Sequence, residues 1–131
     1  MPTISLTELT IDGTTQGVFA NVPPIELNGG GANASGLKIT SGSVTVKSLI
    51  SNRFNYYGIS ASSSVALNVY GSYIGTDANG STALGNGQSG IFLSPNDDNI
   101  VSNIGGTDTN QRNVISGNGG NGIWIEGFYS A

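Results

Sequence analysis

A four-residue pattern recurs along the chain and constrains its fold more than any other feature. Each copy consists of glycine, an apolar residue, a variable residue, and an apolar or small residue, and the copies begin at residues 36, 58, 90 and 122. Their starts therefore lie 22, 32 and 32 residues apart. Apolar residues between the copies alternate over three to five residues, as in short β-strands, and turn residues interrupt every window of about ten residues. Short strands at such a period, without helices between them, predict a solenoid.

The pattern also predicts which side chains stack. Inward positions of successive copies should form two apolar columns, because alternate side chains of a strand share one face. The columns are Leu37, Ile59, Ile91, Ile123 and Ile39, Ala61, Leu93, Ile125. We therefore predict an all-β, right-handed parallel β-helix of about four to five coils, one domain spanning residues 1–131. A β-propeller is the main rival, but its blades need about 40–45 residues and four strands each.

Two further repeats accompany the last two copies. Residues 73–77 (YIGTD) resemble residues 103–108 (NIGGTD), and residues 84–87 (LGNG) resemble residues 116–119 (SGNG). The first similarity predicts equivalent inserts around Gly75–Thr82 and Gly105–Arg112, which would lengthen a 22-residue coil to 32 residues. The second places Asn86 and Asn118 one coil apart, where stacked amides would form a structural ladder along the solenoid axis.

Composition excludes several classes of function. With four Lys and Arg residues and a net charge of −4, the chain cannot neutralise a nucleic-acid backbone, so we expect no nucleic-acid partner. No apolar run approaches the roughly 20 residues of a membrane span, so we expect no membrane insertion. The chain has no Cys and no His, which excludes thiolate chemistry and every mechanism that needs an imidazole.

Four stretches of the chain resemble one family of repeats. They are TELTIDGTTQ (7–16), PPIELNG (23–29), SYIGTDANGSTALGNG (72–87) and RNVISGNGGNGIWIEG (112–127). They resemble the parallel β-helix region, pectate-lyase-like in fold, of large secreted or surface proteins of bacteria. The resemblance implies an extracellular or cell-surface location and a module of a longer repeat protein, or a small stand-alone relative. The chain begins at Met1-Pro2 without a signal peptide.

The acidic residues form no convincing catalytic or metal site. Asp97-Asp98 is the adjacent acidic pair, and two carboxylates could divide the acid and base roles of a glycoside hydrolase. The β-helical polygalacturonases also carry a His motif and an Arg-x-Lys motif, both absent here, so a polar turn is the preferred interpretation. Residues 77–81 (DANGS) resemble the start of a calcium loop without its second half. We expect no catalytic residue, no metal site and no cofactor.

Aromatic residues offer the more promising binding surface. The variable positions of the pattern point outward, which should stack Phe92 and Trp124 on the outer face, one coil apart. Such rings can stack on sugars, form an oligomer contact, or be covered by a neighbouring segment. A second aromatic group poses the same alternatives, and within it Tyr56 and Tyr57 are ligand-binding candidates: Phe54, Tyr56, Tyr57, Tyr70 and Tyr73.

Three functions follow, in order of preference. The first is a non-catalytic β-helix scaffold or carbohydrate-contact module with a polysaccharide partner. The second is a polysaccharide lyase or glycoside hydrolase. The third is a self-associating module, because terminal strands of a solenoid expose unpaired backbone. Ile123, Trp124 and Ile125 are then the expected contacts of a homo-oligomer.

Overall fold

The computed structural model describes residues 3–4, 7–16, 22–96 and 99–127. Its strands form three sheets in which neighbouring strands are parallel. Sheet A has the order β1 (Thr3–Ile4), β4 (Leu37–Ile39), β7 (Ile59–Ser63), β10 (Ile91–Pro95) and β13 (Ile123–Ile125). Sheet B has the order β11 (Asn103–Ile104), β8 (Ala66–Tyr70), β5 (Ser43–Lys47) and β2 (Glu8–Asp12). Sheet C has the order β12 (Val114–Ile115), β9 (Tyr73–Ile74), β6 (Leu49–Asn52) and β3 (Ile25–Asn28).

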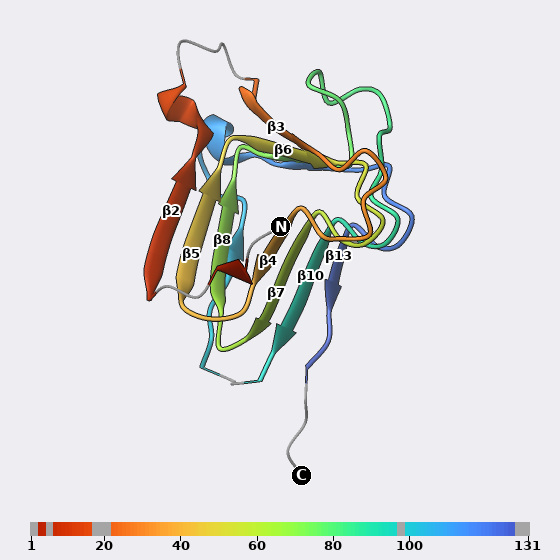
Figure 1. Cartoon of the computed structure of the whole chain (residues 1–131). Coiled ribbons are helices and arrows are strands. Elements are labelled where there is room, and N and C mark those ends of the chain that lie inside the picture. Colours follow the sequence, from red (N-terminus) through yellow and green to blue (C-terminus); the bar gives the residue numbers. More distant parts are fainter. Residues whose placement is uncertain (1–2, 5–6, 17–21, 97–98, 128–131) are drawn as a thin grey trace.

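The chain visits the sheets in the fixed order B, C, A, and we call each such circuit a coil. The three sheets face a shared interior, as Figure 1 shows. Helical structure within the described ranges consists of two short 3-10 turns, η1 (Gly13–Thr15) and η2 (Thr109–Gln111). None of the helices there is long and apolar enough to cross a membrane. The predicted all-β class is confirmed, and the parallel sheets are compatible with a β-solenoid.

Both predicted columns exist in sheet A. Leu37 pairs with Ile59, Ile59 with Ile91, and Ile91 with Ile123. The second column, which runs from Ile39 to Ile125, is in register as well. Facing these columns, sheet B contributes alternating strands whose inward Val and Leu side chains are fully buried: Val44, Val46, Leu67 and Val69. The core is therefore assembled between coils, with no coil large enough to bury its own apolar residues.

The glycine that opens each repeat is required by close packing between coils. A Cβ atom on Gly36 would lie 2.6 Å from the carbonyl oxygen of Gly58. A Cβ atom on Gly58 would lie 2.8 Å from the carbonyl oxygen of Gly90, and one on Gly90 would lie 2.8 Å from the carbonyl oxygen of Gly122. Real Cβ atoms do not approach this closely, so any side chain here would push the neighbouring coil away. Gly122 meets no such carbonyl, since the structure describes no coil beyond it.

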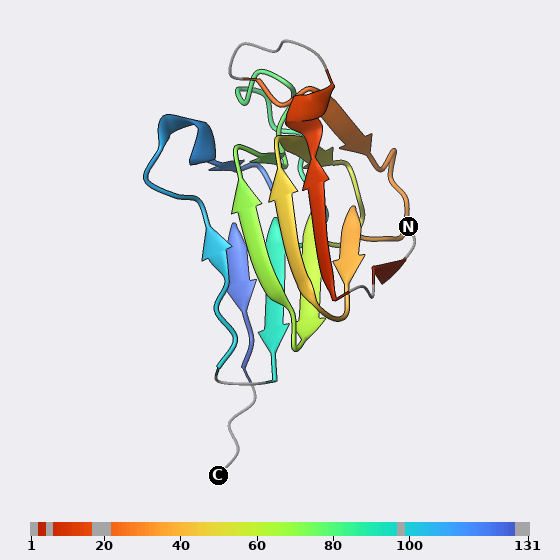
Figure 2. The same ribbon diagram turned by 90° about the vertical axis from the view of Figure 1, so that its left-hand side faces the viewer.

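The predicted equivalence of the inserts is wrong. Tyr73–Ile74 pairs with Val114–Ile115 in sheet C, whereas Asn103–Ile104 pairs with Asn68–Val69 in sheet B. One insert therefore follows the sheet C strand β9, and the other separates β11 from β12. Figure 2 shows the second beside sheet B. The phrases are similar because each ends a strand at a left-handed glycine, Gly75 (φ 97°) or Gly105 (φ 90°). That local turn serves two different corners of the coil.

Asn86 and Asn118, the residues of the predicted ladder, are joined by a hydrogen bond between their side chains. Asn86 Nδ2 donates to Asn118 Oδ1 at 2.9 Å and to the Ser51 carbonyl at 3.2 Å. Asn86 Oδ1 accepts from the backbone N–H of Phe54 at 3.1 Å, and Asn86 is 1% exposed. The amide thus satisfies polar groups of the coils on both sides, where an unpaired buried donor would cost about 1–3 kcal/mol.

A second polar column was not predicted. Asn113 Oδ1 accepts from Ser72 N at 2.9 Å, while its Nδ2 donates to Val69 O at 2.8 Å. Ser72 Oγ in turn accepts from Leu49 N at 3.2 Å. The sequence gives no repeated phrase here, because three different residue types occupy successive rungs of the column.

Replacing Asn86 by Ala should lower the free energy of unfolding by about 2–3 kcal/mol, because it leaves buried backbone groups without partners. Asn118→Ala should cost less, since Asn118 is only partly buried. Asn33→Ala is the matched control: Asn33 accepts an exposed bond from Asn55, and its loss should change stability by less than about 0.5 kcal/mol. Urea unfolding measures all three. Equal effects of Asn86→Ala and Asn33→Ala would contradict a structural role for the ladder.

Candidate functional site

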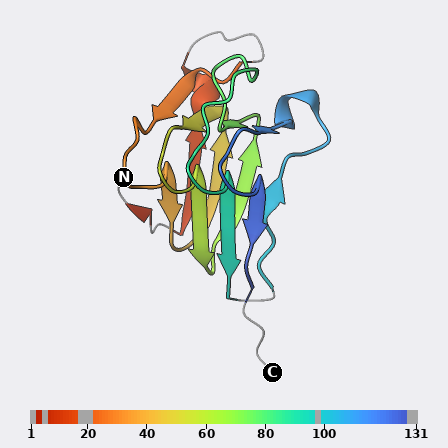
Figure 3. The same cartoon turned by 90° about the vertical axis from the view of Figure 1, so that its right-hand side faces the viewer.

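An aromatic strip lies on the outer face of sheet A, the face that Figure 3 turns toward the viewer. It consists of Tyr57, Phe92 and Trp124. Phe92 and Trp124 are paired in register on β10 and β13, and they point outward because their neighbours in each strand belong to the inward columns. Their ring centroids are 5.2 Å apart at an interplanar angle of 63°. The two rings therefore meet one coil apart, as the repeat predicts, but in an edge-to-face arrangement in place of the expected stacking.

Tyr57 extends the strip in a way that the repeat did not predict. It precedes β7, and the residue of β7 in register with Phe92 is Ser60. Since the serine side chain is small, the ring of Tyr57 can cover this position. Tyr57 and Phe92 stack with centroids 4.7 Å apart and planes 13° from parallel. Phe92 therefore has a ring neighbour on each side, which orients the whole strip.

Exposure differs along the strip. Tyr57 and Phe92 are partly buried, whereas Trp124 is 40% exposed. The outward neighbours of the strip on the same sheet are polar, including Lys38 and Ser60. Trp124 therefore offers a large apolar ring to solvent within an otherwise polar surface.

The predicted second aromatic group does not assemble. Phe54 is buried at 6% exposure next to Asn86, whose amide binds its backbone. Tyr73 lies on β9 in sheet C, and Tyr70 ends β8 in sheet B. Tyr56 is 45% exposed, and the ring contacts found within the described ranges do not include it. Phe54, Tyr56 and Tyr57 share the corner between β6 and β7, whereas Tyr70 and Tyr73 lie on strands of sheets B and C.

The terminal strand β13 is the exposed edge of sheet A. Ile123 and Ile125 continue the inward columns in register, yet they are 40% and 64% exposed, whereas Ile91 and Leu93 beneath them are 0% and 8% exposed. A cavity of about 270 Å³ opens between sheets A and B at this end, lined by both isoleucines together with Leu93 and Ile104. The predicted stacking is confirmed, but no described coil covers the last rung.

Residues 77–82 of the first insert form a turn around the carboxylate of Asp77. Asp77 Oδ1 accepts backbone N–H bonds from Ser81 at 3.1 Å, Thr82 at 3.2 Å and Asn79 at 3.2 Å. These bonds, led by those from Ser81 and Thr82, lower the pKa of Asp77 below its usual value. Similarly, Thr14 donates to Asp12 from its hydroxyl and its backbone and lowers the pKa of Asp12.

No group of three His, Cys, Asp or Glu side chains within the described ranges could hold a metal ion. Asp97 and Asp98, the candidate hydrolase pair, lie outside the described residues.

Comparison of the chain with protein-family models, with curated proteins and with solved structures finds no match. The parallel sheets of the structure are compatible with a parallel β-helix, and the resemblance to pectate-lyase-like repeats is carried by the repeated phrases alone.

Acid should loosen the 77–82 turn. A carboxyl group whose pKa is depressed in the folded state stabilises it above the pKa of the unfolded chain, and this contribution is lost as pH falls through the folded value. Titration of the Asp77 carboxyl carbon by NMR should give a midpoint below about 3.9. Asp77→Asn should reduce the dependence of stability on pH below about 4, the range in which the depressed carboxyl pKa of Asp77 is titrated. A midpoint at or above about 3.9, or an unchanged acid dependence in the variant, would contradict this role for Asp77.

Proposed function

We propose that this protein is a non-catalytic β-helix scaffold that contacts carbohydrate through the aromatic strip of sheet A. The observation that carries the proposal is the row Tyr57, Phe92 and Trp124, because it combines an exposed indole ring with neighbours that fix its position. An exposed aromatic ring beside polar side chains suits a sugar. The C–H face of the sugar stacks on the ring, and its hydroxyls bind the polar groups.

The finer fold assignment belongs to the same proposal. We infer a right-handed, pectate-lyase-like β-helix. In its support, crossover connections between parallel strands of one sheet are right-handed in about 98% of cases, for the steric reasons that twist strands. The repeated phrases in residues 72–87 and 112–127 are what favours a module of a secreted or cell-surface bacterial protein.

Trp124→Ala should weaken binding to polysaccharide about tenfold or more, since a Trp that anchors a binding surface commonly contributes over 1 kcal/mol. Affinity gel electrophoresis with xylan, β-glucan and mannan measures retardation of each variant. Tyr56→Ala is the matched control, because it removes an exposed tyrosine that makes no ring contact with the strip. Absence of retardation in every gel, or equal retardation of wild type and Trp124→Ala, would contradict the proposal.

Self-association is the second candidate function, and the exposed end of the core favours it. Ile123 and Ile125 repeat buried columns without a cover, and the free edge of β13 presents backbone donors and acceptors. A second copy that placed a strand beside β13 would extend sheet A and bury both side chains. Pairing of β13 with β13 of the second copy would close a symmetric dimer, whereas pairing of β13 with the opposite end of the second copy would be heterologous and would build open chains unless its rotation closes a ring.

A charge in the edge strand should abolish this association. Wild type at high micromolar concentration is expected to sediment as a dimer or larger species, and Ile125→Lys as a monomer, because an ammonium group would have to be buried against the apolar column. Tyr56→Lys controls for the added charge on a surface away from β13. A monomeric wild type, or an oligomer unchanged by Ile125→Lys, would exclude this function.

A further inference from the structure

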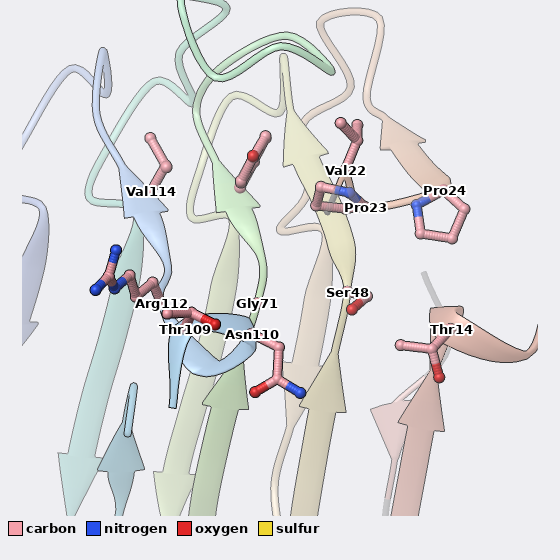
Figure 4. A pocket seen from close by; sticks show the side chains of 11 residues that line it. Thr14, Val22, Pro23, Pro24, Ser48, Gly71, Thr109, Asn110, Arg112 and Val114 are labelled. Atoms are coloured by element: carbon pink, nitrogen blue, oxygen red, sulfur yellow. The ribbon is translucent and has the colours of Figure 1, made fainter. Parts of the chain in front are cut away.

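A groove crosses the outer side of sheet C and joins successive coils. Its volume is about 510 Å³. Val114 on β12, Tyr73 on β9, Ser48 just before β6 and Pro24 just before β3 all line it. Because these strands are consecutive in sheet C, the groove spans three interstrand spacings, roughly 14 Å. Figure 4 shows Val114 and Pro24 at opposite ends, with Ser48 between them. The length suits an extended ligand of a few units.

The wall of the groove is built by the second insert. Its 3-10 turn η2 folds over Gly71, where a Cβ atom would lie 2.6 Å from the carbonyl oxygen of Asn110. Gly71 also needs its left-handed backbone (φ 59°), so glycine serves both the corner and the close contact. Beyond η2, Asn113 is fixed by its two bonds to Ser72 and Val69. The backbone of Arg112 is therefore fixed on one side by η2, which packs on Gly71, and on the other by the hydrogen bonds of Asn113.

Arg112 is the charged residue that lines this groove. Its side chain is exposed, and no ion pair or hydrogen bond of its guanidinium group is found within the described part of the chain. Figure 4 shows Arg112 at the Val114 end of the groove. At the opposite end Thr14 is fixed by its bonds to Asp12, which leave lone pairs of its hydroxyl oxygen free to accept.

The remaining lining alternates polar and apolar groups. Hydroxyl and amide side chains come from Ser48, Thr109 and Asn110, and apolar surface comes from the prolines, Val114 and the ring of Tyr73. Gly80 of the first insert faces this ring, since a Cβ atom there would lie 3.2 Å from it. The second insert therefore lines the groove directly, whereas the first insert packs against the Tyr73 ring that lines it.

We propose that this groove binds a short oligosaccharide that carries one anionic group, with that group at Arg112. A guanidinium group binds a carboxylate or a sulfate through two parallel N–H bonds, and hydroxyl and amide side chains match sugar hydroxyls. An extended peptide fits less well, because peptides of this kind pair with a free sheet edge, and β6 and β9 are paired on both sides. The groove lies on sheet C and the strip on sheet A, so this site does not rest on the proposed function.

Tetrasaccharides of matched length test the proposal: hyaluronan with carboxylates only, chondroitin sulfate with carboxylates and sulfates, and neutral chitotetraose; one anionic group of either charged probe would reach Arg112. Sodium sulfate alone is the fourth probe. Amide shifts in ¹⁵N NMR spectra locate binding, and their concentration dependence gives affinity. We expect at least one anionic tetrasaccharide to shift the amides of Ser48, Gly71, Asn110 and Arg112, and to bind more tightly than chitotetraose. The two anionic probes together show whether the carboxylate or the sulfate is preferred.

Three variants separate this site from the strip. Arg112→Gln should weaken anionic binding about tenfold or more, and Arg112→Lys should retain part of it, since lysine keeps the charge and loses the planar pair of donors. Both should fold normally, because Arg112 is exposed. Trp124→Ala should leave groove binding unchanged, whatever its effect on sheet A. Three results would overturn the proposal: no groove shifts with either anionic tetrasaccharide, equal affinity for chitotetraose, or binding insensitive to Arg112→Gln. Shifts with sodium sulfate equal to those with the tetrasaccharides would show an adventitious ion only, and would overturn it too.

Discussion

Hydrogen bonding between neighbouring coils is the constraint on which the rest of this structure depends. The strands of every sheet come from successive coils, so each strand finds its partners one circuit earlier and one circuit later. The spacing of parallel strands, about 4.8 Å, then becomes the distance at which all other groups must fit. Glycine at the start of each repeat lets the next carbonyl approach, and Asn86 at the corner binds the backbone of the preceding coil and the side chain of Asn118 in the next.

The same constraint explains why the surface is organised in rows. A residue repeated at one position of each coil is stacked on its counterpart, and Phe92 and Trp124 become a ring contact for this reason. Inserts have more freedom, because a corner can be lengthened without changing the register of the strands on either side. They leave the coil at two different corners, and the second insert walls the groove on sheet C while the first packs against Tyr73 in its lining. The repeated geometry of the strands thus produces stacked rows of side chains, and the inserts at the corners produce a groove.

The end of the solenoid follows from the same logic. Ile125 has the backbone environment of a core residue and the exposure of a surface residue, since the side chain that would cover it must come from one coil further on. Coils in the middle bury their columns almost completely. An apolar edge of this kind gains stability from whatever chain continues the sheet, because both the backbone groups and the side chains of β13 then acquire partners.

Much of the interior could be predicted from the sequence. The inward columns, the outward rings and the Asn86–Asn118 rung all depend on repeat spacing, and spacing along the chain becomes position in space once the strands are parallel. By itself, therefore, the sequence determined the β class, the stacking register of sheet A and the asparagine ladder. It did not determine which corner each insert occupies, because a strand that ends at Ile-Gly makes the same local turn at Gly75 and at Gly105. Only the tertiary structure decided this, together with the contact of Tyr57 over Ser60, the column of Asn113 and Ser72, and the setting of Arg112. These features join residues that share no repeat, so their proximity comes from the path of the whole coil.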